Sequence, residues 1–352
     1  MEGGRIPARR GSAHSTPGIF LPGPGWRRLR RGLGIMLFVL GLGLGAGLEG
    51  AAPAAAEPLT LRLSHIYTPE NLWGETAQAF ADAVTARTQG QVQIVINTVR
   101  VDWPAALEGL RSGQNDIVLQ SIGTLDRYHI IAAIESYPYL IRDLEHFRRL
   151  YEGPVGRSLF DEIAARTGFR VVGAAYRGAR HLTSNRKVER VDDLQGLRLR
   201  VPPLKMYRST WDTLGATTVP LGVTELYIAL EQGIVDAQEN PMEGVLQFKL
   251  DAVQKYVVET GHVLGAMTWI YDERRFQALP TETRAILVEE GEKAMRTASA
   301  KMIEQEQSFR KELLRRGLVF IPVDRDRFRE RLTPMLREFP ELAEWVRRIQ
   351  GL

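Results

Sequence analysis

Hydrophobic residues beyond position 57 follow two periods that alternate along the chain. Leu59–Leu63 is a short apolar run typical of a buried strand, and Val92, Ile94 and Ile96 alternate with polar residues as in a half-buried strand. Between these two segments apolar residues recur every three or four positions, which predicts a helix over about Leu72–Arg87. Alternating strands and helices are typical of parallel sheets covered by helices. The same reasoning predicts strands at Asp116–Leu119, Phe169–Ala175, Leu197–Val201 and Ile234–Val235, and helices near Pro104–Ser112, over Glu225–Gln232 and from Pro241 onward.

A longer stripe of apolar and small residues occurs late in the chain. It recurs at steps of three or four from about Thr281 to Arg316. A continuous helix over this range would be about 54 Å long at ~1.5 Å per residue, well beyond one small domain. Gly291 and Gln305 interrupt the stripe, which argues against an isolated coiled coil. The pattern therefore predicts a single helix that lies across two domains.

The first 56 residues have the pattern of an export signal. Arg27, Arg28, Arg30 and Arg31 precede the apolar stretch Leu33–Leu48, and the small residues Ala54–Ala56 follow it. As a helix this stretch would reach only about 24 Å, short of the ~30 Å bilayer core. We expect residues 1–56 to be an N-terminal extension and a cleavable signal peptide, which places the mature protein in the periplasm without a permanent membrane anchor. The alternative is an uncleaved anchor.

Length and charge narrow the class of protein. At about 100–200 residues per domain, the 352 residues indicate two domains. Residues 1–56 hold seven of the 46 basic and two of the 42 acidic side chains, which leaves 39 basic and 40 acidic residues, a net charge near −1. The basic pI therefore results from residues 1–56. It gives no support for nucleic-acid binding, which needs a basic face on the folded domain. The absence of cysteine excludes disulfides and thiolate catalysis.

Few side chains are arranged for catalysis or metal binding. No nucleophile elbow, phosphate-binding loop or zinc-protease motif is present in the sequence. Glu239 could serve as a general acid or base, but it has no basic or nucleophilic partner in its motif. We therefore predict a protein without metal or cofactor that is not an enzyme. The histidines are scattered without metal-ligand spacing, at His14, His65, His129, His146, His181 and His262.

Five motifs then follow one another in order between residues 178 and 241. They are Gly178–Arg180, Gly196–Pro202 (GLRLRVP), Leu214–Ala216 (LGA), Glu225–Leu230 (ELYIAL) and Val235–Pro241 (VDAQENP). This succession resembles the solute receptors of tripartite ATP-independent periplasmic (TRAP) transporters. The resemblance implies an α/β, two-domain periplasmic-binding-protein fold with central mixed sheets, a hinge cleft and a long helix spanning both domains. It implies domain I at residues 57–177 plus 266–305, and domain II at residues 178–265 plus 306–352.

The resemblance also implies a ligand site. Arg200 corresponds to the arginine that forms a salt bridge with the ligand carboxylate, Arg180 to a second arginine near that carboxylate, and Asn240 to an asparagine that hydrogen-bonds the ligand. A guanidinium can hold a carboxylate through two parallel N–H donors, which lysine cannot do. The alternatives are a hinge or ion-pair role for Arg180 and an ordinary Asn-Pro turn for Asn240. Further candidates from the first domain, each with a core or surface role as its alternative, are His65, Trp73, Gln120 and Trp103.

The resemblance implies a periplasmic receptor that binds a small organic acid and delivers it to the membrane subunits of an ion-gradient-driven TRAP transporter. We expect it to act as a monomer. The alternative is a receptor that presents its ligand to a sensor kinase. Sialic-acid receptors of the family have an asparagine where this chain has Pro203 and an aromatic residue where it has Val223. Because unpaired sugar hydroxyls are costly to bury, we predict a smaller or less polar carboxylate than sialic acid.

Overall fold

The computed structural model describes residues 57–97 and 103–352, and the predicted signal peptide lies outside these residues. Strands and helices alternate over this range, as the hydrophobic pattern predicts. The strands are β1 Leu59–Ser64, β2 Val92–Asn97, β3 Ile117–Ser121, β4 Phe169–Ser184, β5 Arg198–Val201, β6 Thr217–Pro220, β7 Ala237–Pro241, β8 Tyr256–Asp272 and β9 Val319–Ile321. The α-helices are α1 Leu72–Arg87, α2 Trp103–Ser112, α3 Leu144–Tyr151, α4 Pro154–Thr167, α5 Lys205–Thr213, α6 Val223–Glu231, α7 Met242–Gln247, α8 Glu273–Ala278, α9 Thr281–Arg315, α10 Arg325–Leu332 and α11 Ala343–Gln350.

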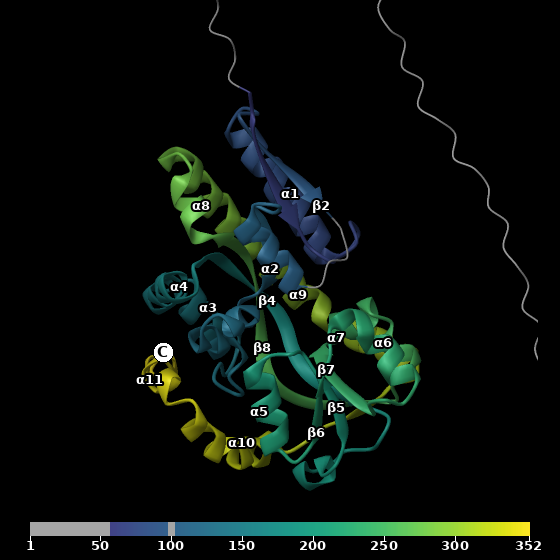
Figure 1. The fold of residues 1–352 in the computed structure, drawn as a ribbon. Helices are drawn as coiled ribbons and strands as arrows, with labels where there is room; N and C mark the ends of the chain where they lie inside the picture. The colour runs from purple at the N-terminus through teal and green to yellow at the C-terminus, as the bar shows by residue number, and fades with distance from the viewer. Residues whose placement is uncertain (1–56, 98–102) are drawn as a thin grey trace, which may run out of the picture. The chain divides into compact units, whose positions relative to one another are not determined.

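The described strands form one mixed sheet in the order β2-β1-β3-β8-β4-β7-β5-β6, with β9 paired to β8. β1 pairs in parallel with β2 and β3, and β5 pairs in parallel with β6 and β7. The long strands β4 and β8 are antiparallel to each other and join these two parallel sets. In Figure 1, β4 and β8 run through the middle, with β2 toward one end and β5 and β6 toward the other. The two crossing strands therefore merge the sheets of both halves into one.

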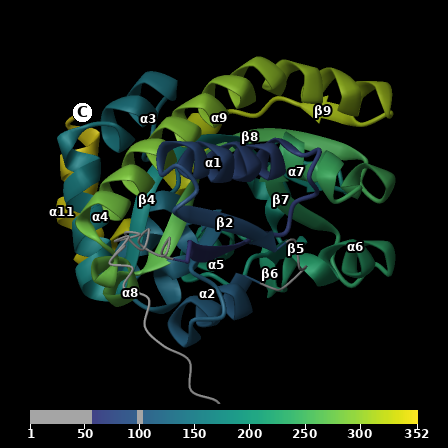
Figure 2. The ribbon, with the colours of Figure 1, turned by 90° about the horizontal axis from the view of Figure 1, so that it is seen from above.

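Helix α9 confirms the predicted long helix and ends within one residue of the predicted boundary. It packs along β4 and contacts α1 and α7, so it spans both parallel strand sets, as Figure 2 shows. Gly291 lets the helix approach the sheet, because a Cβ at this position would lie 3.1 Å from the Trp269 ring and 3.2 Å from Val172. The glycine that interrupts the apolar stripe is thus a contact point with the sheet.

The predicted strand at Ile234–Val235 is wrong. The backbone N–H groups of both residues donate to the Ala229 carbonyl, at 2.9 and 3.3 Å, and complete the C-terminal turn of α6. Gly233, with φ of +65°, reverses the chain at this turn, and the strand begins only at Ala237. Two adjacent β-branched residues thus follow the end of a helix, because their backbone hydrogen bonds to the helix outweigh their preference for a strand.

Two hydrophobic cores support the sheet. The larger includes residues under α1, α2, α9 and the strands β1, β3 and β8, whereas the smaller gathers around α6, α7 and the end of α9. Within residues 57–97 and 103–352, no helix is both long and apolar enough to cross a bilayer. The same ranges contain no group of three or more side chains placed to hold a metal ion.

Candidate ligand-binding site

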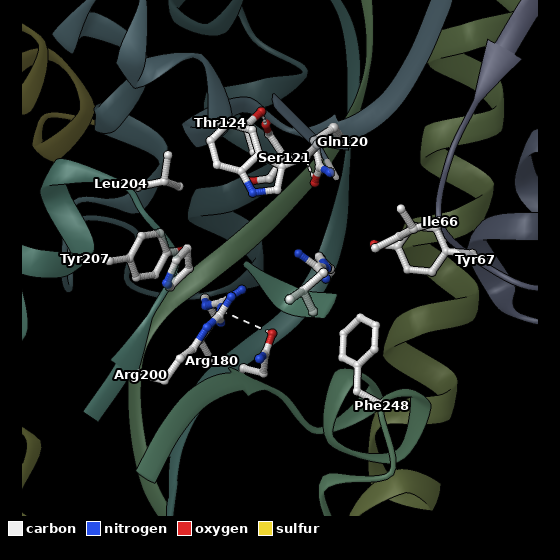
Figure 3. A pocket seen from close by; sticks show the side chains of 15 residues that line it. Ile66, Tyr67, Gln120, Ser121, Thr124, Arg180, Arg200, Leu204, Tyr207 and Phe248 are labelled. Carbon is white, nitrogen blue, oxygen red and sulfur yellow. Dashed lines mark hydrogen bonds between the residues drawn. The ribbon is translucent and has the colours of Figure 1, made fainter. Parts of the chain in front are cut away.

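A pocket of about 70 Å³ lies where the two parallel strand sets meet across β4 and β8. Its lining comes from both sides. Gln120 and Ser121 end β3 and Thr124 follows this strand, whereas Arg200 is on β5 and Asn240 on β7. Figure 3 shows the labelled side chains around this space. The pocket residues are Ile66, Tyr67, Trp103, Gln120, Ser121, Thr124, Arg177, Arg180, Arg200, Pro202, Leu204, Tyr207, Val223, Asn240 and Phe248.

Arg200 is a buried cation without a carboxylate partner among the described residues. Only 3% of it is exposed. Its Nε and Nη2 both donate to the Leu221 carbonyl, at 2.9 and 2.7 Å. Burial lowers the pKa of Arg200 to about 10, although the negative charge of Glu239 partly opposes this. The group remains charged at neutral pH, so the pocket contains a positive charge that a bound anion would neutralise.

Arg180, in contrast, already has a carboxylate partner. Its Nη2 donates to Glu239 Oε1 at 2.7 Å, its Nε donates to Glu239 Oε2 at 2.5 Å, and its guanidinium lies 5.0 Å from the Tyr207 ring centre. Burial alone would raise the pKa of Glu239, but the charge of Arg180 and hydrogen bonds from His262 and Arg180 lower it to about 2. The ion-pair role foreseen as the alternative for Arg180 is therefore present, although the residue also lines the pocket.

Arg177 joins these two arginines in the pocket because of a β-bulge. In a regular strand residues 177 and 180 would point to opposite faces. Between the pairs Tyr176–Ala266 and Ala179–Leu264, however, β4 has one residue more than β8. Gly178 adopts φ of +98° within this bulge. The extra residue brings Arg177 and Arg180 to the same pocket, as bulges that redirect side chains do.

The Arg177 side chain is 9% exposed, and its Nε has no hydrogen-bond partner among the described residues. No carboxylate of the described chain lies within ion-pair distance of its guanidinium, unlike the arrangement at Arg180. Buried polar groups are almost always hydrogen-bonded, so an unpaired guanidinium nitrogen at a pocket wall indicates a position for a ligand oxygen.

Three other predicted site residues also line the pocket. Asn240 donates through Nδ2 to Gln238 and accepts a hydrogen bond from Arg180 at 3.3 Å. The Gln120 side-chain oxygen accepts from the Ser121 N–H at 3.0 Å, and its amide nitrogen has no partner among the described residues. Trp103 begins α2 and contributes part of the wall.

His65 and Trp73 do not line this pocket. Trp73 is fully buried, because the second residue of α1 faces the larger core. His65 borders a separate hollow beside α1, and its Nδ1 accepts a hydrogen bond from the Tyr67 N–H at 3.2 Å. Burial lowers the pKa of His65, which keeps the ring neutral near pH 7. The structure thus brings together five of the seven predicted site residues.

Sequence reasoning missed Arg177, Tyr67, Tyr207 and Phe248, all of which line the pocket. Arg177 lies next to the first matched motif, so the glycine that follows it was the available signal for a bulge. The other three are aromatic residues in segments without a motif. Their position depends on the approach of segments that are distant in sequence.

Several hydrogen bonds connect the two sides of the site. Asp126, from the segment after β3, accepts from the Lys205 N–H at the start of α5, at 2.9 Å. Asn71, the N-cap of α1, donates to Glu243 of α7 at 2.7 Å. Both bonds join residues of the first predicted domain to residues of the second. These contacts must therefore break if the two sides of the pocket separate.

A pocket with buried arginines, set between two α/β halves that a long helix spans, defines a solute-binding protein. The chain belongs to the family of bacterial extracellular solute-binding proteins, family 7, whose model matches residues 63–342. The long helix and the mixed sheet agree with this family, and the predicted two-domain periplasmic-binding-protein fold is confirmed.

Relatives and solved structures agree with this assignment. A solute-binding protein of Verminephrobacter eiseniae is 30% identical over 91% of this chain and 93% of its own. The sialic acid-binding periplasmic protein SiaP of Vibrio cholerae is 27% identical over 82% of this chain and 91% of its own. A TRAP periplasmic solute-binding protein from Polaromonas, bound to D-erythronate, is 26% identical with a TM-score of 0.78, over 84% of this chain and 99% of that one.

Proposed function

We propose that the protein captures a small carboxylate in the pocket and delivers it to the membrane subunits of a TRAP transporter. The observation that carries the proposal is Arg200, a buried guanidinium at the pocket wall that has no carboxylate partner among the described residues. A ligand carboxylate would supply the missing charge through two parallel hydrogen bonds. The comparisons do not favour the sensor-kinase alternative.

In this proposal Arg200, Arg177 and Gln120 bind the ligand. Arg180 and Asn240 line the pocket and hold each other in place, and Trp103 forms part of the pocket wall. Arg180 orients Asn240, because its Nη2 donates to the amide oxygen. Glu239 holds Arg180 in turn. His65 and Trp73, which lie away from the pocket, serve packing in this proposal.

Capture proceeds by hinge closure of two domains, residues 57–177 plus 266–305 and residues 178–265 plus 306–352. Gly178, with its positive φ in the bulge of β4, lies at the proposed boundary. Closure would form the Asp126–Lys205 and Asn71–Glu243 bonds and exclude water from the carboxylate. Charge-assisted hydrogen bonds strengthen when water is excluded, so ligand binding and closure stabilise each other.

The proposal includes export to the periplasm through a cleavable signal peptide within residues 1–56, and action as a monomeric binding protein without catalysis. The relatives are named as solute-binding or periplasmic proteins, which supports export and a binding role. Turnover of a bound acid by the purified protein would contradict the binding-only role. Retention of the mature chain in washed membranes would contradict the cleaved signal peptide.

The test uses ligand-induced thermal shifts with a panel of carboxylates and their uncharged amides. Wild-type protein should gain melting temperature with at least one acid and with none of the amides. Arg200→Met should lose this response, whereas Arg198→Met should keep it. Arg198 is the matched control, because it lies on the same strand but is exposed and pairs with Asp236 at 2.6 Å. A response that survives in Arg200→Met would refute the assignment.

A further inference from the structure

The pocket wall opposite the arginines is apolar. Figure 3 shows Ile66 and Phe248 across the pocket from Arg180 and Arg200. Trp103 and Val223 also belong to the lining. Ile66 and Trp103 are attached to the larger core, whereas Phe248 packs on the smaller core, so the apolar groups approach from both halves of the protein. The pocket therefore has a cationic end and an apolar end.

Several polar groups between these ends are engaged within the protein, whereas the Arg177 Nε and the Gln120 amide nitrogen have no partner among the described residues. The Ser121 hydroxyl donates to Glu135 at 2.9 Å, and the Thr124 hydroxyl donates to the Ser121 carbonyl at 2.6 Å. The Asn240 amide has internal partners at both its oxygen and its nitrogen. No carboxylate is among the described residues that line the pocket. Ligand hydroxyls would therefore find few strong acceptors there, and unpaired buried hydroxyls are costly.

The apolar end adjoins a second cavity of about 730 Å³, whose lining also includes the polar residues Thr68, Glu70, Asn71, Thr224, Gln247 and Lys249. Ile66, Trp103, Val223 and Phe248 line both cavities, so they form the passage between them. The passage gives the small pocket room for a longer ligand on the side away from the arginines. A ligand held at Arg200 by its carboxylate would direct its other end toward these four side chains.

We propose that the ligand is a carboxylate with an apolar body, aliphatic or aromatic, and that Ile66, Trp103, Val223 and Phe248 select it. This inference rests on the proposed function of carboxylate capture. The apolar body would contact side chains from both halves, so its burial favours closure of the domains. Hydroxyl-rich acids of equal length lose this contribution, and their hydroxyls lose hydrogen bonds to water.

The first test measures dissociation constants by calorimetry for butanoate, pentanoate, hexanoate and 4-methylpentanoate, with D-erythronate as the hydroxylated acid. Each added methylene should strengthen binding roughly fourfold, since burial of one CH₂ is worth about 0.8 kcal/mol. D-Erythronate should bind more weakly than butanoate, which has the same number of carbons. Tighter binding of D-erythronate, or no gain with chain length, would overturn the inference and leave carboxylate capture intact. Absence of binding by every acid would instead contradict the proposed function.

The second test uses variants of the passage. Phe248→Ala should weaken 4-methylpentanoate binding about tenfold or more and change acetate binding less than threefold, because only the longer acid reaches the ring. Val223→Thr, which keeps the side-chain shape but adds a hydroxyl, should act in the same direction. Val95→Thr is the matched control, since Val95 is 48% exposed on β2 and lies outside both cavities. Equal losses for the long and short acids would show that the passage does not contact the ligand, and would overturn the inference.

Discussion

Replacement of Arg200 by methionine should abolish ligand binding without reducing the stability of the ligand-free protein. The guanidinium is 3% exposed, and its pKa falls from the ordinary arginine value to about 10 because of burial. At about 1.36 kcal/mol per pKa unit, this lowering corresponds to a cost of about 3 kcal/mol for the charged form in the folded state. The variant removes that cost but also removes both donors from the Leu221 carbonyl, a loss of about 1–3 kcal/mol.

The two effects nearly cancel, so the free energy of unfolding of ligand-free Arg200→Met should equal or exceed that of the wild type by up to about 2 kcal/mol. Urea unfolding at pH 7 measures this difference. Arg198→Met controls for the substitution on the same strand and should change stability by less than about 1 kcal/mol, since its ion pair is exposed. A loss of more than about 2 kcal/mol in Arg200→Met would refute the reasoning, because it would mean that the fold depends on the cation.

Three further predictions concern other charged groups, two near the pocket and one at a contact between its sides. Arg177→Gln should weaken carboxylate binding about tenfold in calorimetry while the thermal stability of the ligand-free protein stays unchanged, since a charge-assisted hydrogen bond is worth about 1.5–3 kcal/mol; unchanged affinity would remove Arg177 from the site. Burial opposes ionisation of Glu239, but the charge of Arg180 outweighs this effect and the pKa of Glu239 is lowered to about 2. The ionised carboxylate therefore stabilises the fold by about 3 kcal/mol above pH 4.5, and this contribution is lost as the pH falls toward 2. Glu239→Gln should cost about 3–5 kcal/mol in urea unfolding at pH 7, and a cost below 1 kcal/mol would contradict the buried pair. Burial raises the pKa of Asp126 to about 6, because its effect is larger than the opposite effect of the hydrogen bond from the Lys205 N–H. Ionisation of Asp126 therefore removes up to about 3 kcal/mol of stability as the pH rises from about 4 to 6. Asp126→Asn should remove this pH dependence in unfolding measurements, and an unaltered pH profile would count against it.

Most of the fold could be predicted from the sequence because hydrophobic periodicity reports which face of an element is buried. Helix α1 and the long helix α9 follow their apolar stripes to within one residue. The exception at Ile234–Val235 arises where backbone bonds to Ala229 complete a helix end. Periodicity describes side chains, so it does not detect such local backbone bonding.

The site could be predicted only in part. Arg200 and Asn240 belong to matched motifs on strands β5 and β7, and both line the pocket. Arg177 was not predicted, because regular strand alternation places its side chain on the opposite face from Arg180. The bulge that brings both side chains to one face depends on how β4 pairs with a strand distant in sequence. Trp73 shows the reverse case. Its side chain faces the core, because an aromatic residue near a helix start has the same sequence appearance whether it is buried or facing a cleft.

The central claim is that a carboxylate ligand binds at Arg200 between the two halves of the protein. A crystal structure of the mature protein with the acid that shows the largest thermal shift tests this claim most directly. We predict both carboxylate oxygens within hydrogen-bond distance of the Arg200 guanidinium, with the rest of the ligand directed toward Phe248. An acid bound at another place, with Arg200 still donating only to the Leu221 carbonyl, would contradict the account.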